Sequence, residues 1–341
     1  MSISTLRHTV QHGLLDFAWR QWAELGLAGH RAAPEHRPVD PEALLLFTIE
    51  VARRDPRLFD EMLDWLCVNG QLLILQRIRN LAPRFAVDAD LLDAVLAWVA
   101  TQAPNVRWPS ASEPRRRQED GSEPVFKADV ASFTSDQDPV FARFGYLRPP
   151  ASRSGKSMEP QVHRPSNLAF RLRLFFGSGT RSEVMRVLLT TAAGPMDAAS
   201  IADEAGYAKR NVHEALTGLA ASGAVQARWS RNERRFTVAR DKWASLLEIG
   251  PDASHLPQSV PWQRVLPTLV DVLVWLEEEG ASHDSAYLAS SRARDLVERV
   301  RPALDAVAVT APPDHTPPGE AYLTALARTV GSLMTVLAPD P

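Results

Sequence analysis

The sequence predicts a mainly α-helical fold in three parts, with one small β-hairpin in the middle part. Three observations indicate this. Apolar residues recur at helical spacing over most of the chain, strand-like alternation is confined to residues 225–238, and two segments rich in proline and serine interrupt the helical pattern. With 341 residues, the chain has room for two or three domains.

Residues 1–103 are predicted to form a helical domain. Their apolar residues fall into four or five stripes with short connections, which is typical of a bundle, and Asp40–Pro41 supplies the capping residue and proline that commonly begin a helix. The carboxylates of this region are expected to form a solvated face, because no histidine has the spacing of a bundle metal site. They are Glu50, Asp60, Glu61 and Asp64.

Residues 104–165 are predicted to be a linker. Proline, serine and charged residues dominate its two ends, and the triplet Arg115–Arg117 is interpreted as part of a solubilising segment. The middle of the linker, residues 125–150, is too aromatic for a free coil, so we expect it to dock on a neighbouring domain. Its aromatic residues are Phe126, Phe133, Phe141, Phe144 and Tyr146.

The segment 167–176 is predicted to begin the central part of the chain as a helix. Arg171 and Arg173 are expected on its outer side. Thr180 or Ser178 is expected to cap the helix that follows. The residues expected on the buried side of the first helix are Leu168, Leu172 and Phe175.

Two short helices are predicted to meet at a tight turn near Gly206. Glycine suits the left-handed conformation that ends a helix, so Gly206 ends the first helix and Gly223 the second, while Asp197 caps the start of the first. After Gly223 the spacing alternates, which indicates a hairpin that turns at 230–233. The apolar residues that hold the two helices together are Ile201, Ala202, Ala205, Val212, Ala215, Leu216 and Leu219.

This order of elements resembles the winged helix-turn-helix of bacterial transcriptional regulators, in the broad sense that covers the MarR-type and ArsR-type families. The resemblance covers residues 180–242, about a fifth of the chain. It implies that the second helix lies in the major groove of DNA and that the hairpin, or wing, lies on the backbone or in the minor groove. The predicted fold is therefore an N-terminal helical bundle, a central winged helix-turn-helix with a small hairpin wing (166–249) and a helical C-terminal region (250–341).

The charge distribution separates the central region from the rest of the chain. The net charge is −3 overall, but residues 170–242 hold twelve basic and seven acidic residues, a net charge of +5, which leaves −8 for the remainder. A basic region on an acidic chain is typical of a protein that contacts phosphate with one part only.

The outward side chains of the second helix and of the wing are the candidate DNA contacts. Arginine reads guanine and asparagine reads adenine through paired hydrogen bonds, so Arg210, Asn211 and His213 are the leading base contacts, and Lys209 is assigned to phosphate. The alternative is an ordinary polar helix surface. The complete set is Lys209, Arg210, Asn211, His213, Thr217, Arg228, Arg231, Asn232, Arg234 and Arg235, with Arg234 and Arg235 on opposite sides of the wing.

The last part of the chain is predicted to contain three helices, at 262–279, 285–307 and 321–337. Their apolar faces can pack on their own chain or on a second subunit, and the sequence leaves both open. A short helix at 241–247 is expected to pack on the central region through Trp243, Leu246 and Leu247.

The sequence is compatible with two classes of function and argues against a third. The first is a DNA-binding transcriptional regulator, a homodimer on a palindromic double-stranded site, under a small-molecule or protein effector. The second is an interaction component that uses the winged helix as a docking surface in a larger assembly, or in a toxin–antitoxin or defence system. The third, an enzyme, is not expected, because the histidines are scattered and no nucleophile, phosphate-loop or metal-ligand motif occurs. No cofactor or metal is expected.

The sequence also predicts a cytoplasmic location. Its single cysteine, Cys67, lies in an apolar run, as expected for a buried thiol in a reducing compartment. The N-terminus lacks the features of a secretory signal, and no apolar run has the length needed to span a bilayer.

Overall fold

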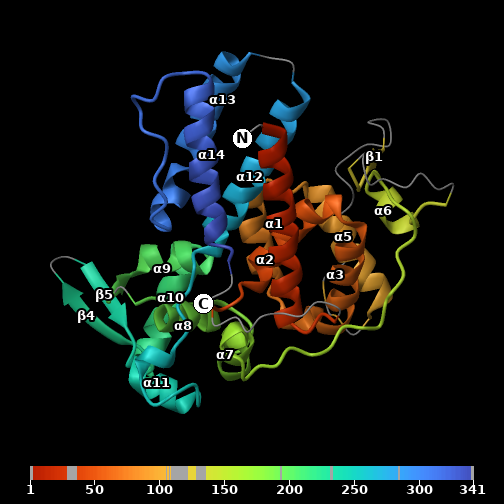
Figure 1. The fold of residues 1–341 in the computed structure, drawn as a ribbon. Coiled ribbons are helices and arrows are strands. Elements are labelled where there is room, and N and C mark those ends of the chain that lie inside the picture. Colours follow the sequence, from red (N-terminus) through yellow and green to blue (C-terminus); the bar gives the residue numbers. More distant parts are fainter. Residues whose placement is uncertain are drawn as a thin grey trace.

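The computed structural model shows a mainly helical chain, as predicted, with two small sheets in its described part (Figure 1). The structure describes residues 3–28, 37–104, 106, 108, 122–127, 136–192, 194–230, 233–282 and 285–338.

The described N-terminal part contains five helices, and a short 3-10 turn follows each of α2, α3 and α4. Asp40 caps the second helix, as predicted, and its carboxylate accepts a hydrogen bond from the Ala43 amide at 3.1 Å. The elements are α1 (Ile3–Glu24), α2 (Pro41–Val51), η1 (Ala52–Arg54), α3 (Pro56–Asn69), η2 (Gly70–Leu72), α4 (Leu75–Leu81), η3 (Ala82–Phe85) and α5 (Ala89–Gln102).

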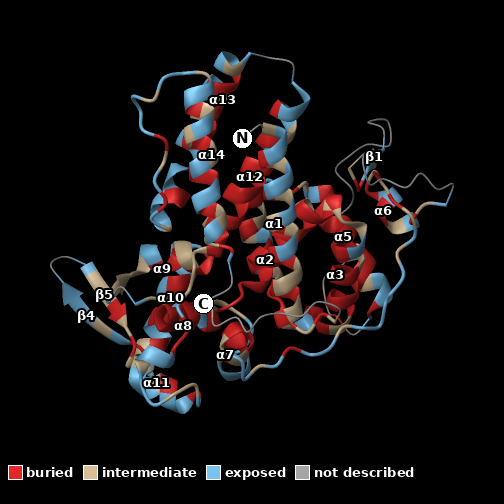
Figure 2. Cartoon of the chain, viewed as in Figure 1, coloured by how far each residue is buried: buried red, intermediate tan, exposed pale blue. Residues whose placement is uncertain are grey.

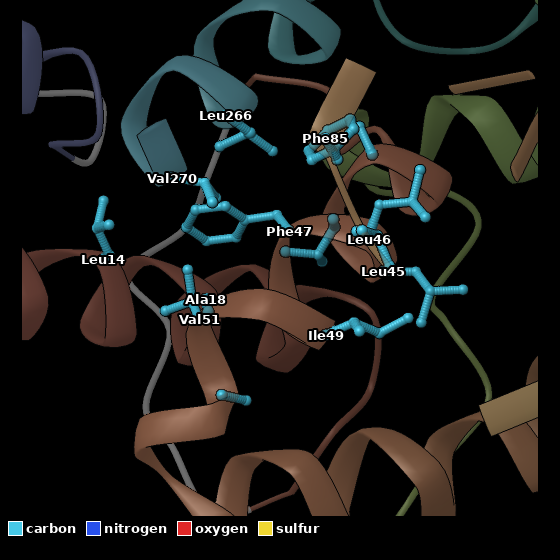
Figure 3. Close-up of a cluster of buried hydrophobic side chains, with 14 of the residues drawn as sticks. Leu14, Ala18, Leu45, Leu46, Phe47, Ile49, Val51, Phe85, Leu266 and Val270 are labelled. Carbon is cyan, nitrogen blue, oxygen red and sulfur yellow. The ribbon is translucent and has the colours of Figure 1, made fainter. Parts of the chain in front are cut away.

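The three predicted C-terminal helices form and pack on the N-terminal ones. They are α12 (Trp262–Ala281), α13 (Ala286–Ala306) and α14 (Glu320–Thr335). One hydrophobic cluster runs from Leu6 to Leu337, and α12 lies along α1 and α2 (Figures 1 and 2). In Figure 3, Leu14 and Phe47 converge with Val270 of α12. These C-terminal faces are therefore covered by their own chain, and we call α1–α5 with α12–α14 the helical body.

The aromatic segment of the linker packs on the body. It contains β1 (Glu123–Pro124), α6 (Pro139–Arg143) and β2 (Tyr146–Leu147), and the two strands pair in parallel. The guanidinium of the buried Arg148 lies 5.1–5.5 Å from three ring centroids. Phe133 and Arg115–Arg117 lie outside the described residues. The buried aromatic residues are Phe126, Phe141, Phe144 and Tyr146.

The solvated face predicted for Glu50, Asp60, Glu61 and Asp64 is wrong. Glu50 on α2 and Asp60 on α3 are half-buried, and Asp60 is paired with the buried Arg148. Glu61 and Asp64 are buried, and they accept hydrogen bonds from Ser154 (2.7 Å) and Ser157 (2.8 Å) of the segment that returns over this helix. Burial alone would raise the pKa of Asp64, but hydrogen bonds from Ser157, from the Gly155 amide and from Arg153 lower it. Distant serines therefore hold carboxylates that the helical pattern places outside.

The central module has a second, smaller core, which Ile74 beside α4 joins to residues between Leu168 and Leu256. Its three strands are antiparallel in the order β3–β5–β4, and the hairpin β4–β5 projects away from the helical body (Figure 1). The pairing of Met196 with Phe236 in this sheet was not predicted. The elements are α7 (Leu168–Phe176), α8 (Thr180–Thr190), β3 (Met196–Asp197), α9 (Ala198–Ala205), α10 (Lys209–Ala221), β4 (Gln226–Ser230), β5 (Glu233–Thr237) and α11 (Arg240–Leu246).

The orientation predicted for α7 is wrong in two positions. Phe175 is 54% exposed, and Arg173 is buried and bound to the carboxylates of Glu42 and Glu183. Leu168 and Leu172 are buried as predicted. A hydrophobicity pattern assigns arginine to the surface, whereas here the partners of Arg173 lie inside.

Two further local predictions are corrected. The cap of α8 is not Thr180 or Ser178: the helix starts after Gly179, whose carbonyl accepts a hydrogen bond from the Ser182 hydroxyl at 2.8 Å. At the end of α11, Leu246 is exposed, whereas Leu247, which follows the helix, is buried. This helix ends at Leu246, so only one side of its last turn meets the module.

Candidate nucleic-acid interface

The turn between α9 and α10 has the geometry predicted for it. The carboxylate of Asp197 caps α9 by accepting hydrogen bonds from the amides of Ala199 and Ser200, both at 2.9 Å. Gly206 has φ +74° and ψ +34°, the left-handed conformation, and Gly223 has φ +76° beyond the end of α10. The residues predicted to hold the helices together are all buried, and they are Ile201, Ala202, Ala205, Val212, Ala215, Leu216 and Leu219.

The opposite face of α10 is free of contacts with the core. The side chains of this helix that were assigned to DNA are exposed. Lys209, Arg210 and Asn211 stand in its first turn, where the unpaired amides and the helix dipole favour an anion. The hydroxyl of Thr217 donates to the carbonyl oxygen of His213 at 2.8 Å. The exposed residues are Lys209, Arg210, Asn211, His213 and Thr217.

The hairpin carries arginines on both faces. Arg228 pairs with Arg235 across the strands, and Trp229 pairs with Arg234. Arg234 lies over the Phe236 ring at 5.5 Å, while the Arg235 guanidinium contacts the Glu233 carboxylate at 3.3 Å. Arg234 and Arg235 thus lie on opposite faces, as predicted, and the alternation leaves one arginine pair directly across the ladder.

Trp229 continues the alternation of the hairpin, but the module does not cover it. Val225 and Ala227 are covered by the module, but Trp229 is 75% exposed. The alternation itself is correct, since the pairs Ala227–Phe236 and Trp229–Arg234 share one face. The outer half of the hairpin extends beyond the module, so nothing lies beneath this ring. The predicted contacts Arg231 and Asn232 at the hairpin tip lie outside the described residues.

A loop beside α10 adds residues that the sequence did not assign to the interface. A cavity of about 370 Å³ lies between residues 176–181 and the exposed face of α10, where Asn211 and Glu214 line it. Arg181 also lines it and is exposed. The basic charge of Arg181 was the available signal, but only the tertiary structure brings it next to Asn211.

The surface of the module is less basic than its sequence. Arg173, Arg186 and Glu183 are buried together, which leaves ten basic and six acidic residues in 170–242, a net charge of +4. The remaining basic residues include those of α10 and the hairpin. The part of the module outside this buried cluster therefore keeps an excess of positive charge.

Comparison with known proteins finds no matching family model, no similar curated protein and no similar solved structure. Within the described ranges, no three histidine, cysteine, aspartate or glutamate side chains gather in a way that could hold a metal ion. No helix in the described part of the chain combines the length and the apolar character needed to cross a bilayer.

Proposed function

We propose that the chain is a sequence-specific transcriptional regulator that binds double-stranded DNA, with residues 180–242 acting as a winged helix-turn-helix. The observation that carries the proposal is the division of α10 into two faces. Val212 and Leu216 anchor one face in the module, while the other presents Arg210, Asn211 and His213 to solvent. A helix anchored in this way can enter a major groove without losing its own packing.

In the proposed complex, the start of α10 faces the bases. Arg210 and Asn211 offer paired hydrogen bonds to guanine and adenine, and Lys209 binds phosphate. The hairpin lies along the backbone, where Arg228 and Arg235 form one cationic face. The cavity beside Asn211 brings Arg181 to the same side of the module.

The proposal includes a homodimer and a location in the cytoplasm. Helix-turn-helix proteins bind two half-sites about one DNA turn apart, so a two-fold symmetric pair of chains would select a palindrome. The helical body would receive the small-molecule or protein effector. A palindromic consensus in selected DNA and a particle mass of two chains in solution are the expected results.

The test is selection from random duplex DNA, followed by a salt titration of binding to the selected sequence. Replacing Arg228 and Arg235 together with Ala should lower affinity for all sequences and reduce the salt slope by about two. Arg328→Ala changes an exposed arginine of α14 and is the matched control, for which we expect no change. Absence of an enriched sequence together with salt-independent binding would overturn the proposal.

A second candidate is favoured by one observation. Leu174 and Phe175 at the end of α7 are 69% and 54% exposed, which is unusual for neighbouring apolar side chains. A docking component of a larger assembly, or of a toxin–antitoxin or defence system, would use such a surface. Retention of selected DNA binding by a Leu174→Ser, Phe175→Ser variant would separate this surface from the DNA interface.

A further inference from the structure

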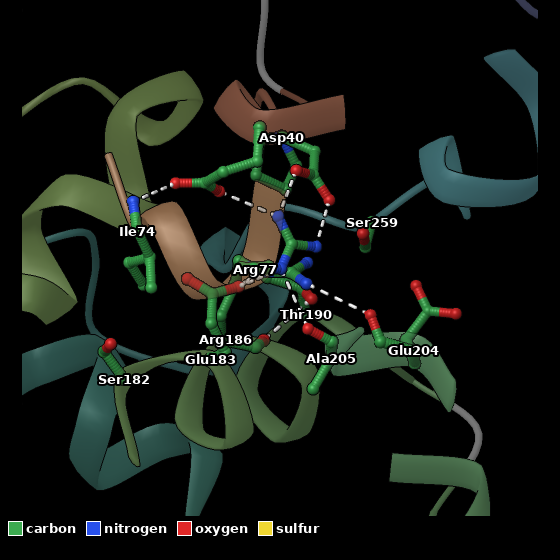
Figure 4. A network of polar contacts seen from close by, with 12 residues as sticks. Asp40, Ile74, Arg77, Ser182, Glu183, Arg186, Thr190, Glu204, Ala205 and Ser259 are labelled. Carbon is green, nitrogen blue, oxygen red and sulfur yellow. Dashed lines mark hydrogen bonds and ion pairs between the residues drawn. The ribbon is translucent and has the colours of Figure 1, made fainter. Parts of the chain in front are cut away.

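Six buried charged side chains join the helical body to the central module, and Figure 4 labels Asp40, Arg77, Glu183 and Arg186 among them. Three are arginines and three are carboxylates, so their formal charges cancel. Two of the carboxylates lie at the start of α2, one arginine lies on α4, and the other three residues lie on α7 and α8. The residues of this joint are Asp40, Glu42, Arg77, Arg173, Glu183 and Arg186.

Arg77 is the cation that the helical body contributes to the joint, and its side chain is fully buried. Its guanidinium binds Asp40 at 2.6 Å and Glu42 at 2.8 Å. Arg173 of the module binds the same Glu42 at 2.9 Å and Glu183 at 2.8 Å. Buried charges are tolerated only with partners at such distances, so body and module depend on each other here.

Arg77 also reaches the end of α9. The last carbonyl oxygens of a helix have no partner within the helix. In α9, those of Ala202 and Asp203 accept hydrogen bonds from backbone amides of the turn, whereas those of Glu204 and Ala205, and that of Gly206 beyond the helix, accept from side chains. The contacts are Arg186 Nη2 to Glu204 O at 3.3 Å, Arg77 Nε to Ala205 O at 2.8 Å, and Asn80 Nδ2 to Gly206 O at 3.1 Å. Two of these three donors belong to α4 of the body, and Figure 4 shows Arg77 between Asp40 and Ala205.

The backbone of the turn lies close against α4. A Cβ atom on Gly206 would stand 2.9 Å from Leu81 Cδ2, so only glycine permits this approach. Arg77, Asn80 and Leu81 are three and four positions apart, which places them on one face of the helix. The turn that leads into α10 therefore cannot shift on α4 without breaking two hydrogen bonds and this contact.

We propose that Arg77 is a positioning residue for α10: by holding the Ala205 carbonyl and the buried carboxylates at once, it makes the helical body set the direction in which Lys209–His213 face outward. Arginine suits this task because its planar fork donates in several fixed directions. The hydrogen bonds concern the fold alone, whereas the consequence for base reading rests on the proposed function.

The test uses the full-length chain and native-state hydrogen exchange. Arg77→Met unbalances the buried charges and destabilises the whole chain, so we expect exchange of the amides of residues 206–212 to accelerate about tenfold more than exchange of the amides of α3. Arg77→Lys should give an intermediate result, because an ammonium keeps the charge but lacks the fork. Asn80→Ala leaves the charged joint intact and removes only the hydrogen bond to Gly206, so we expect exchange of the same amides to accelerate by about threefold. If Arg77→Met does not fold, the Asn80→Ala result alone tests the positioning role.

The matched control is Arg148→Met. Arg148 is also buried and paired with a carboxylate, but it lies over the aromatic segment. This variant should destabilise the chain without a selective effect on residues 206–212. Equal acceleration in both arginine variants, or unchanged exchange at residues 206–212 in Asn80→Ala, would overturn the positioning role.

Binding of the selected DNA supplies the second readout. For Arg77→Lys and Asn80→Ala, the ratio of specific to non-specific affinity should fall by about tenfold and threefold, because misdirected base contacts are lost while phosphate contacts persist. If exchange is selectively faster at residues 206–212 but the chain binds no DNA, the proposed function is contradicted and the positioning role is not. Selective exchange effects with an unchanged specificity ratio would contradict the link to base reading.

Discussion

The arginines on the inner and outer sides of the central module occupy opposite environments. On the inner side, Arg173 and Arg186 are buried with Glu183, and their charge is cancelled within the protein. On the outer side, Arg210 and Arg228 are exposed and leave their charge to solvent or to a ligand. A sequence count adds both kinds together, yet only the outer kind can attract phosphate, whereas the inner kind joins two parts of the fold.

The largest effect should come from removing the carboxylate of the inner side. Glu183→Ala leaves three arginines facing two carboxylates in a buried space, so the free energy of unfolding should fall by about 3–5 kcal/mol. Urea denaturation at neutral pH measures it. Glu233→Ala removes an exposed hairpin carboxylate instead and should change stability by no more than about 0.5 kcal/mol. Similar losses in the two variants would erase the distinction between the two sides.

Acid should lower the stability that the buried carboxylates of the inner side provide, whereas the outer arginines keep their charge. Burial alone would raise the pKa of Glu183 and of Asp40, but neighbouring arginines, Arg77 above all, lower both. A carboxyl whose pKa is lower in the folded state than in the unfolded state, where it is about 4, stabilises the fold above pH 4, and this stability is lost as the pH falls through the folded value.

In urea denaturation from pH 6 to pH 3, the midpoint should therefore decrease, because the free energy of unfolding falls by a few kcal/mol. Glu183→Gln lacks one of the linked protons, so its midpoint should depend less on pH over the same range. Parallel pH profiles for the wild type and this variant would show that Glu183 is not a source of the dependence.

The smallest effect tests the outer side alone. Asn211→Ala should leave stability unchanged and reduce discrimination at one base position by about 1–3 kcal/mol, because a single paired hydrogen bond is lost. Binding to a set of single-base variants of the selected site measures it. Lys209→Ala is the contrast and should weaken binding about equally on every sequence. Uniform loss in Asn211→Ala would remove this residue from base reading.

Local features of the module were predictable because they depend on residues close in sequence. The left-handed Gly206, the Asp197 cap and the buried face of α10 each follow from a few neighbouring positions. The exposed set on α10 follows from the same helical period. By contrast, the burial of Arg173 was missed, since its partner Glu42 lies 131 positions away. The exposure of Trp229 likewise depends on the tertiary structure, because alternation does not show where the hairpin leaves the module.

By itself, the sequence determined the mainly helical character, the turn at Gly206 and the alternating faces of the hairpin, because backbone preferences and apolar periods act over one or two turns. Only the tertiary structure decided that helices from both ends of the chain share one core, and that Arg77 of the body holds the Ala205 carbonyl. Those outcomes depend on burial and on partners that lie far apart in sequence. An arginine has the same backbone preference in either setting. Only its surroundings decide whether its charge is neutralised by buried carboxylates or exposed to solvent.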